Sequence, residues 1–187
     1  TAVGSNALEQ NTTGDNLTAI GQGALAANTT GGYNTACGMF ALNTISTASN
    51  NTAVGYVALQ TSNAADNTAV GYKCLQDAST GASNTGVGAF ALQETTTASY
   101  CTAMGHNAMG DGVTTGNWNT AMGHNALKSN TTGYSNTAIG QAAGDAITTG
   151  YTNIALGVEA LGACSTGYNN VAIGVEALDA LTGAANN

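Results

Sequence analysis

Two histidines are the only imidazole bases in this 187-residue sequence. His106 and His124 both follow Met-Gly and precede Asn-Ala, so they occupy the same place in two similar segments. With so few bases the sequence offers no nucleophile–base–acid constellation, and we predict no catalytic residue and no enzyme. Stacked segments would bring the imidazoles within about 5 Å of each other, and three such pairs around an axis could bind a metal ion. Two exposed turn residues are the simpler interpretation, so we predict neither a metal site nor a cofactor.

Charged residues are scarce and mostly acidic. Ten acidic and two basic residues, Lys73 and Lys128, give a net charge of −8. The lack of a basic patch argues against nucleic-acid binding. No apolar run approaches the ~18 residues of a membrane span, so we predict no membrane insertion in this segment. Glu159 and Glu176 share one place in neighbouring segments, but the G-G-x-G-x-D repeat of calcium-binding β-rolls is missing, and we predict no calcium site.

The cysteines do not form a disulfide pattern. Cys37, Cys74, Cys101 and Cys164 fall at different places of the repeat and never in neighbouring repeats, so we expect no bridge within one chain. Cys37 and Cys74 replace valine and alanine, and we predict that both are small buried side chains. Free thiols fit a product folded in a reducing cytosol, such as a virion fibre.

Aromatic residues recur at turn positions. Tyr134, Tyr151 and Tyr168 share one position in three consecutive repeats, and Trp118 and Tyr100 occupy the neighbouring one. Exposed aromatic ladders beside Asn and Thr can hold sugar rings, cover turns or mediate contacts between chains. A host-surface glycan or receptor is therefore a candidate partner at Tyr134, Tyr151, Tyr168 and Trp118.

The elements that must position these residues come from an internal repeat, N-T-A-V-G-x-x-A-L-x-x-x-T-T-G-x-x. Eleven copies are anchored on glycines spaced 17 residues apart, with one interval of 16 and one of 18. The irregular intervals fall near residues 63–66 and 112–113, in the half of the repeat where loops tolerate length changes. The anchors are Gly4, Gly21, Gly38, Gly55, Gly71, Gly88, Gly105, Gly123, Gly140, Gly157 and Gly174.

The repeat predicts an all-β fold. The T-A-V-G segment is typical of a short strand, and Gly or Asn interrupts any helix every few residues. We therefore predict one domain over residues 1–187, a parallel β-solenoid (β-roll) of about eleven 17-residue coils. At about 4.8 Å per coil, the rod would be about 50 Å long. The chain starts at Thr1, partway through a repeat, and we expect it to be an excerpt of a longer fibrous protein.

Alternation along the strand suggests which columns face inward. We predict that the apolar residue before each anchor glycine and the threonine two places earlier fill the interior, and that either the Ala or the Leu of A-L points out. The alanine between the threonine and the apolar residue would then form an outer face that another chain could approach closely. The other interpretation is that this alanine packs tightly inside the coil. This column contains Ala19, Ala36, Ala53, Ala69, Ala103, Ala121, Ala138, Ala155 and Ala172.

The N-T-A-V-G-x-x-A-L repeat resembles the N-S-V-A-I-G-x-x-S-x-A motif in the heads of YadA-like trimeric autotransporter adhesins. It is more similar still to N-T-A-I-G-x-x-A-L repeats of phage tail fibres and large bacterial surface proteins. The resemblance covers essentially the whole chain, although this period is longer and the T-T-G turn is extra. It implies a left-handed β-roll, three chains side by side, and an extracellular location on a virion or bacterial cell surface.

Three functions remain open on the sequence. The first is a structural or adhesive fibre segment, a stalk or head that forms a homotrimer. The second is an ice-binding β-solenoid, suggested by the threonine columns, although the T-T pair sits in a turn and not as T-x-T on a strand. The third is a subunit of a self-assembling extracellular filament, since neither end of the sequence carries a polar capping segment.

Overall fold

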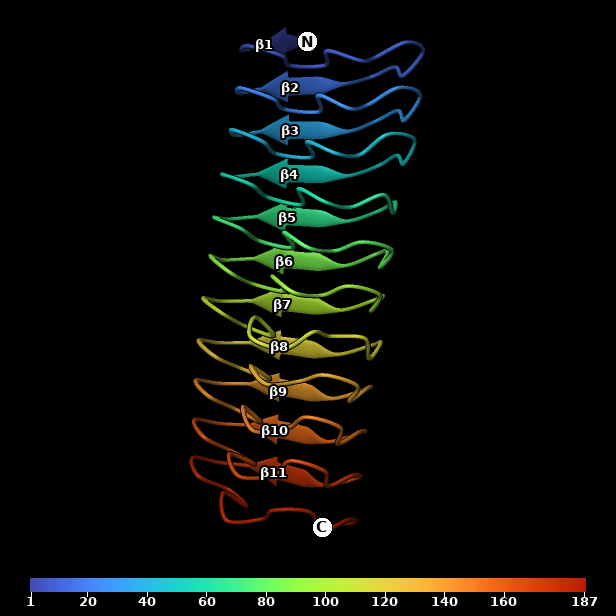
Figure 1. The fold of residues 1–187 in the computed structure, drawn as a ribbon. Helices are drawn as coiled ribbons and strands as arrows, with labels where there is room; N and C mark the ends of the chain where they lie inside the picture. Colours follow the sequence, from blue (N-terminus) through green and yellow to red (C-terminus); the bar gives the residue numbers. More distant parts are fainter.

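The chain forms a single rod of stacked coils, as the computed structural model of residues 1–187 shows (Figure 1). Each coil carries one short strand, and the structure contains no helix. The predicted all-β parallel solenoid is therefore confirmed. The strands are β1 (Ala2–Val3), β2 (Thr18–Ile20), β3 (Thr35–Cys37), β4 (Thr52–Val54), β5 (Thr68–Val70), β6 (Thr85–Val87), β7 (Thr102–Met104), β8 (Thr120–Met122), β9 (Thr137–Ile139), β10 (Ile154–Leu156) and β11 (Val171–Ile173).

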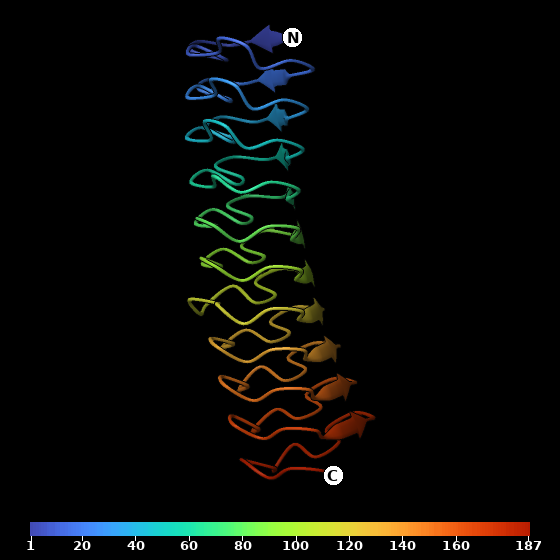
Figure 2. The same ribbon diagram turned by 90° about the vertical axis from the view of Figure 1, so that its right-hand side faces the viewer.

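The strands form one parallel sheet in sequence order, β1 to β11. Equivalent residues of neighbouring repeats are partners, for example Ala19 with Ala36 and Ala36 with Ala53. The sheet runs along one side of the rod (Figure 2). Of 122 backbone hydrogen bonds, 103 involve at least one residue outside the strands. The turns therefore contribute most of the backbone bonding in the rod.

The two irregular repeats leave the sheet intact. Thr52 pairs with Thr68 across the 16-residue interval, and Thr102 pairs with Thr120 across the 18-residue interval. The missing and the extra residue are both absorbed in the turns, as predicted.

The direction of the strand side chains was predicted wrongly. The middle alanines, Ala19 through Ala172, are inside the coil and 0–1% exposed, whereas the preceding threonines are half-buried and the following apolar residues mostly exposed. The side chains do alternate along these strands of two or three residues, but the inward and outward positions are the reverse of those predicted. Alanine recurs because the coil is thin and only a small side chain fits opposite the inward leucines. Of the two interpretations of the alanine column, tight packing inside the coil is therefore the correct one.

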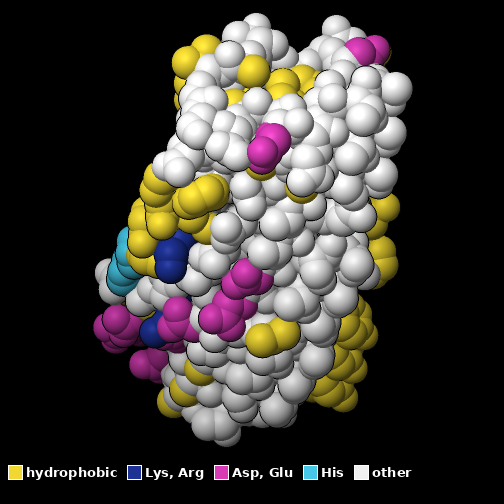
Figure 3. All heavy atoms as spheres, turned by 45° about the horizontal axis from the view of Figure 1, so that its top comes forward, with side chains coloured by type: hydrophobic (Ala, Val, Ile, Leu, Met, Phe, Trp, Pro, Cys, Tyr) yellow, Lys and Arg dark blue, Asp and Glu magenta, His cyan; other side chains and the backbone are white.

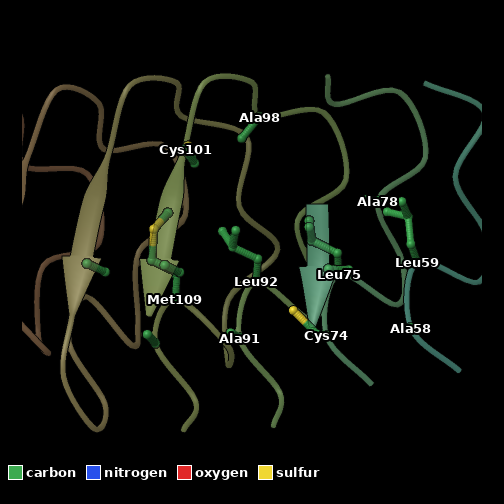
Figure 4. Packing of buried hydrophobic residues seen from close by; sticks show 14 of the residues in the cluster. Ala58, Leu59, Cys74, Leu75, Ala78, Ala91, Leu92, Ala98, Cys101 and Met109 are labelled. Atoms are coloured by element: carbon green, nitrogen blue, oxygen red, sulfur yellow. The ribbon is translucent and has the colours of Figure 1, made fainter. Parts of the chain in front are cut away.

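Both residues of the A-L pair face inward, which alternation did not predict. Leu42 and its equivalents lie in the left-handed region, with φ between 48° and 55°, and Gly144 takes that place in one coil at φ 59°. This conformation costs a non-glycine residue about 1–2 kcal/mol. It turns the side chain back into the coil, where all members except Leu8 and Leu178 of the end coils are fully buried beside the alanine column (Figure 4). The segment after the anchor glycine is therefore a turn, to which the two-residue period of a strand does not apply.

Asparagine side chains form a second interior column, at the first position of the repeat. In Asn136, Oδ1 accepts a hydrogen bond from the backbone N–H of Asn153 at 3.0 Å, and Nδ2 donates to the carbonyl of Gly150 at 2.8 Å. Each such amide thus bonds its own coil to the next one. The buried members are Asn34, Asn51, Asn67, Asn84, Asn119, Asn136, Asn153 and Asn170.

Candidate functional surfaces

The outward face of the sheet carries an unbroken apolar column. Its exposed side chains retain between 36% and 67% of their accessible surface, and Val87 is partly buried. No charged residue occurs in this column or in the adjacent threonine column. We call the two outward columns together the sheet face. The apolar column consists of Val3, Ile20, Cys37, Val54, Val70, Val87, Met104, Met122, Ile139, Leu156 and Ile173.

The threonines of the sheet face lie in register beside the apolar column. Eight consecutive strands, β2 to β9, begin with an outward, half-buried threonine, from Thr18 to Thr137. In β10 and β11 the position is taken by Ile154 and Val171, which are exposed. The sheet face is therefore neutral along the whole rod, and it becomes more apolar toward β11.

A row of rings lies just after the anchor glycines, at the first position in four coils and at the second, Phe90, in one. Tyr56 stacks on Tyr72 at 5.5 Å between ring centroids, and Phe90 meets both Tyr72 and His106 edge-on. His106 and His124 end the row, stacked at 5.4 Å, close to the distance predicted from the repeat. The pair thus belongs to an aromatic row, and two imidazoles are fewer than the three or four ligands of a usual zinc site.

No group of three or more metal-ligating side chains is arranged to hold a metal ion. Asp145, Glu159 and Asp179 line one shallow depression of about 270 Å³. Burial raises the pKa of the Asp145 carboxyl, partly offset by a hydrogen bond from the backbone N–H of Ala146. Figure 3 shows that the histidines, the lysines and several acidic side chains gather on one side of the rod, while most of the visible surface carries neither charge nor large apolar groups.

The turn aromatics form two separate stacks, as their shared positions predicted. Tyr134, Tyr151 and Tyr168 stack with ring centroids 4.9 and 4.8 Å apart and ring planes within 5° of parallel. Tyr100 and Trp118 stack at 6.2 Å with planes 6° apart. Trp118 is 58% exposed. The four residues proposed for ligand contact thus lie at the surface, in two neighbouring columns.

The cysteines are all unpaired. Cys74, Cys101 and Cys164 are buried, and burial raises the pKa of each thiol, to about 12 for Cys74. Cys37 is exposed. The prediction of a buried Cys74 is confirmed, and that of a buried Cys37 is wrong because its column belongs to the sheet face.

Sequence reasoning missed the sheet face and the asparagine column. The signal for the sheet face was the apolar column itself, which accepts valine, isoleucine, leucine, methionine and cysteine without regard to volume. A closely packed interior restricts volume, as the alanine column does. The signal for the asparagines was their recurrence at one position in eight repeats, since a buried amide must be hydrogen-bonded.

Comparisons of this chain with protein-family models, with curated proteins and with solved structures give no match. The structure has no helix long and apolar enough to cross a membrane. The functional proposal therefore depends on the geometry of the rod and on the resemblance of its repeat.

Proposed function

We propose that this chain is a structural fibre segment that associates side by side with other copies of itself through the sheet face. The observation that carries the proposal is the continuous apolar column from Val3 to Ile173, which is exposed in every coil except at the partly buried Val87. Monomers rarely expose a contiguous apolar patch larger than a few hundred Å². Covering this column would remove that surface from water at about 25 cal/mol per Å².

A second copy of the chain is the partner that fits the face best. The sheet repeats one strand per coil in strict register over β1 to β11. Only a partner with the same coil spacing can place an equivalent side chain against each of these rows. The face carries no charge, so two copies bring no like charges together. Neutral faces of this kind are typical of permanent interfaces between copies of one chain.

The resemblance of the repeat to trimeric adhesin heads and tail fibres favours three copies in this assembly. It also favours a stalk or head on a virion or bacterial surface over an internal location. The shape supports this role, because a rod in which each coil is hydrogen-bonded to the next keeps its two ends apart and exposes its turns to the surroundings. The apolar column forms the proposed interface. The sequence had suggested the alanine column for this role.

Sedimentation velocity of two matched double variants tests the proposal. Val54→Glu with Val70→Glu puts two charges on the sheet face in neighbouring coils, at side chains 38% and 37% exposed. Val158→Glu with Val175→Glu puts two charges on exposed valines that lie outside the sheet face. We expect the unchanged chain and the second variant to sediment as a discrete oligomer, with the mass of a trimer, and the first variant to sediment as a monomer. Circular dichroism checks that all three keep their β structure.

An unchanged chain that stays monomeric from about 1 to 100 µM would contradict the proposal. Equal dissociation of both double variants would mean that the chains do not associate through the sheet face. Rods of many lengths would indicate the filament and not the discrete fibre segment.

Ice binding is the second candidate, because eight consecutive strands place a threonine outward in register. These are not the turn threonines that the sequence highlighted. The variable size of the apolar column, from valine to methionine, makes the face uneven and disfavours a match to a lattice. Thermal hysteresis by a stable monomer would support this function, and its absence in a monomer would exclude it.

A further inference from the structure

The end of one aromatic stack lies beside the end of the other. Tyr134 is the first ring of the three-tyrosine stack, and the equivalent position in the preceding coil holds Asn117. Trp118 is the last ring of its stack, and the equivalent position in the following coil holds Ser135. The backbone confirms these columns, since Ser135 N–H donates to the Asn117 carbonyl at 3.0 Å and Thr152 N–H donates to the Tyr134 carbonyl at 3.0 Å. The face of Tyr134 toward the preceding coil is therefore not stacked on another ring. The same holds for the face of Trp118 toward the following coil.

A surface depression of about 330 Å³ lies at this junction. It is lined by Thr115, Gly116, Asn117, Trp118, Thr132 and Tyr134. We call it the Trp118 cleft. Its volume is at the small end of the roughly 300–1,000 Å³ of ligand sites. Gly116 leaves the lining without a side chain at that point, and the indole of Trp118 is 58% exposed.

The lining combines aromatic rings with free polar groups. The Asn117 Oδ1 accepts a hydrogen bond from the Ser99 N–H at 2.8 Å, which fixes the amide and leaves Nδ2 available to donate. Thr132 is exposed, and its hydroxyl can donate and accept. The Trp118 indole adds an N–H donor, and the Tyr134 phenol adds a hydroxyl. Apolar ring faces beside convergent donors and acceptors suit a ligand with one apolar face and a rim of hydroxyls.

We propose that the Trp118 cleft binds a neutral sugar, with a pyranose ring against the indole and its hydroxyls hydrogen-bonded to Asn117, Thr132 and Tyr134. No charged side chain lines the cleft, and the chain carries a net charge of −8. An acidic sugar would meet no counter-charge here and would be repelled by the chain as a whole. The site is independent of the proposed assembly, because none of its residues belongs to the sheet face.

Trp118 is the only tryptophan, so its fluorescence reports on this cleft alone. The probes are the methyl α- and β-glycosides of glucose, galactose, mannose and N-acetylglucosamine, with N-acetylneuraminic acid as the acidic comparison. We expect at least one neutral glycoside to change the Trp118 emission saturably, with a Kd on the order of 1 mM. N-acetylneuraminic acid is expected to produce no saturable change.

Three variants separate binding from structural stacking. Tyr134→Ala and Thr132→Val are each expected to weaken the affinity at least fivefold. Tyr168→Ala removes a ring from the far end of the same stack and should leave the affinity within twofold. Saturation-transfer NMR of the sugar checks Trp118→Ala, which should abolish the signal, and thermal unfolding checks that each variant is folded.

Two results would overturn the proposal. One is an emission that no neutral glycoside changes saturably up to about 100 mM. The other is an affinity that Tyr134→Ala and Thr132→Val leave unchanged, or that Tyr168→Ala lowers equally, because the rings would then only cover the turns. Binding of the acidic sugar alone would also overturn it.

Discussion

The sulfur of Cys74 occupies the space that a Cβ atom on Gly86 would need. A Cβ built on Gly86 would lie 2.5 Å from the Cys74 Sγ. Cys74 is the one larger residue in the inward alanine column after the anchor glycine, and Gly86 is the one smaller residue in the alanine column of the strands. The two departures from the repeat therefore compensate each other in the interior, between one coil and the next.

This pair predicts strong coupling in a double-mutant cycle. Gly86→Ala alone should lower the free energy of unfolding by about 1–3 kcal/mol through overpacking against the sulfur. Cys74→Ala alone should cost about 1 kcal/mol through the space left by the sulfur. The double variant restores the Ala–Ala pair of the other coils, and we expect it to be more stable than Gly86→Ala. Chemical denaturation of the four proteins measures the coupling, and additive effects would contradict the compensation.

Alkaline pH should destabilise the rod through Cys74. Burial raises the pKa of this thiol from 9.0 to about 12, so the folded chain holds the neutral form where the unfolded chain has lost the proton. The stabilisation is complete below pH 9 and is lost as the pH rises toward 12, at about 1.4 kcal/mol per unit. Between pH 7 and 10.5 we expect the Tm to fall further than in the Cys74→Ala/Gly86→Ala variant, which has the same tyrosines. Parallel Tm curves for the two proteins would show that the thiol contributes nothing.

The corner glycines should tolerate alanine only where no coil packs against them. Gly105 has φ +132° and an added Cβ would lie 2.6 Å from the Gly123 carbonyl oxygen. Gly174 has φ +130°, and its added Cβ would meet only the Ala177 Cβ, at 3.9 Å. Both alanine variants carry similar backbone strain, so the contact with the next coil accounts for their difference. We expect Gly105→Ala to lose at least about 2 kcal/mol more than Gly174→Ala in thermal or denaturant unfolding. Equal losses would mean that φ strain alone selects glycine at the corners.

The asparagine column should be as important to stability as the apolar core. Asn136→Ala leaves the buried N–H of Asn153 and the carbonyl of Gly150 without their amide partner. Each unsatisfied buried group costs about 1–3 kcal/mol, so we expect a loss of about 2–4 kcal/mol. Gln141→Ala, at an exposed side chain of the same coil, should cost less than about 0.5 kcal/mol.

Unfolding of the Asn136→Ala variant should also become less cooperative, because neighbouring coils stabilise each other and the break falls between them. A single transition with an unchanged midpoint would show that water replaces the lost bonds.

The spacing of the anchor glycines was sufficient to predict the coils, the parallel register and the loops that absorb the 16- and 18-residue intervals. Shared positions were also sufficient to predict the stacks of Tyr134 on Tyr151 and of His106 on His124, because in-register coils place equal positions one coil apart. The Trp118 cleft could be predicted from the sequence only in part. Its rings were predicted, but the gap between two stacks depends on which positions adjoin in space.

Only the tertiary structure decided which face of the strand is the interior. The repeat pattern is compatible with either phase, since valine and alanine are both apolar. The choice depends on Leu42 and its equivalents, which adopt a left-handed backbone conformation that sequence patterns do not predict for leucine. That turn sends the leucines inward, and the little space left opposite them admits Ala53 and excludes Val54. The apolar column is consequently outside, and it makes the sheet face the surface through which we propose that the rod assembles.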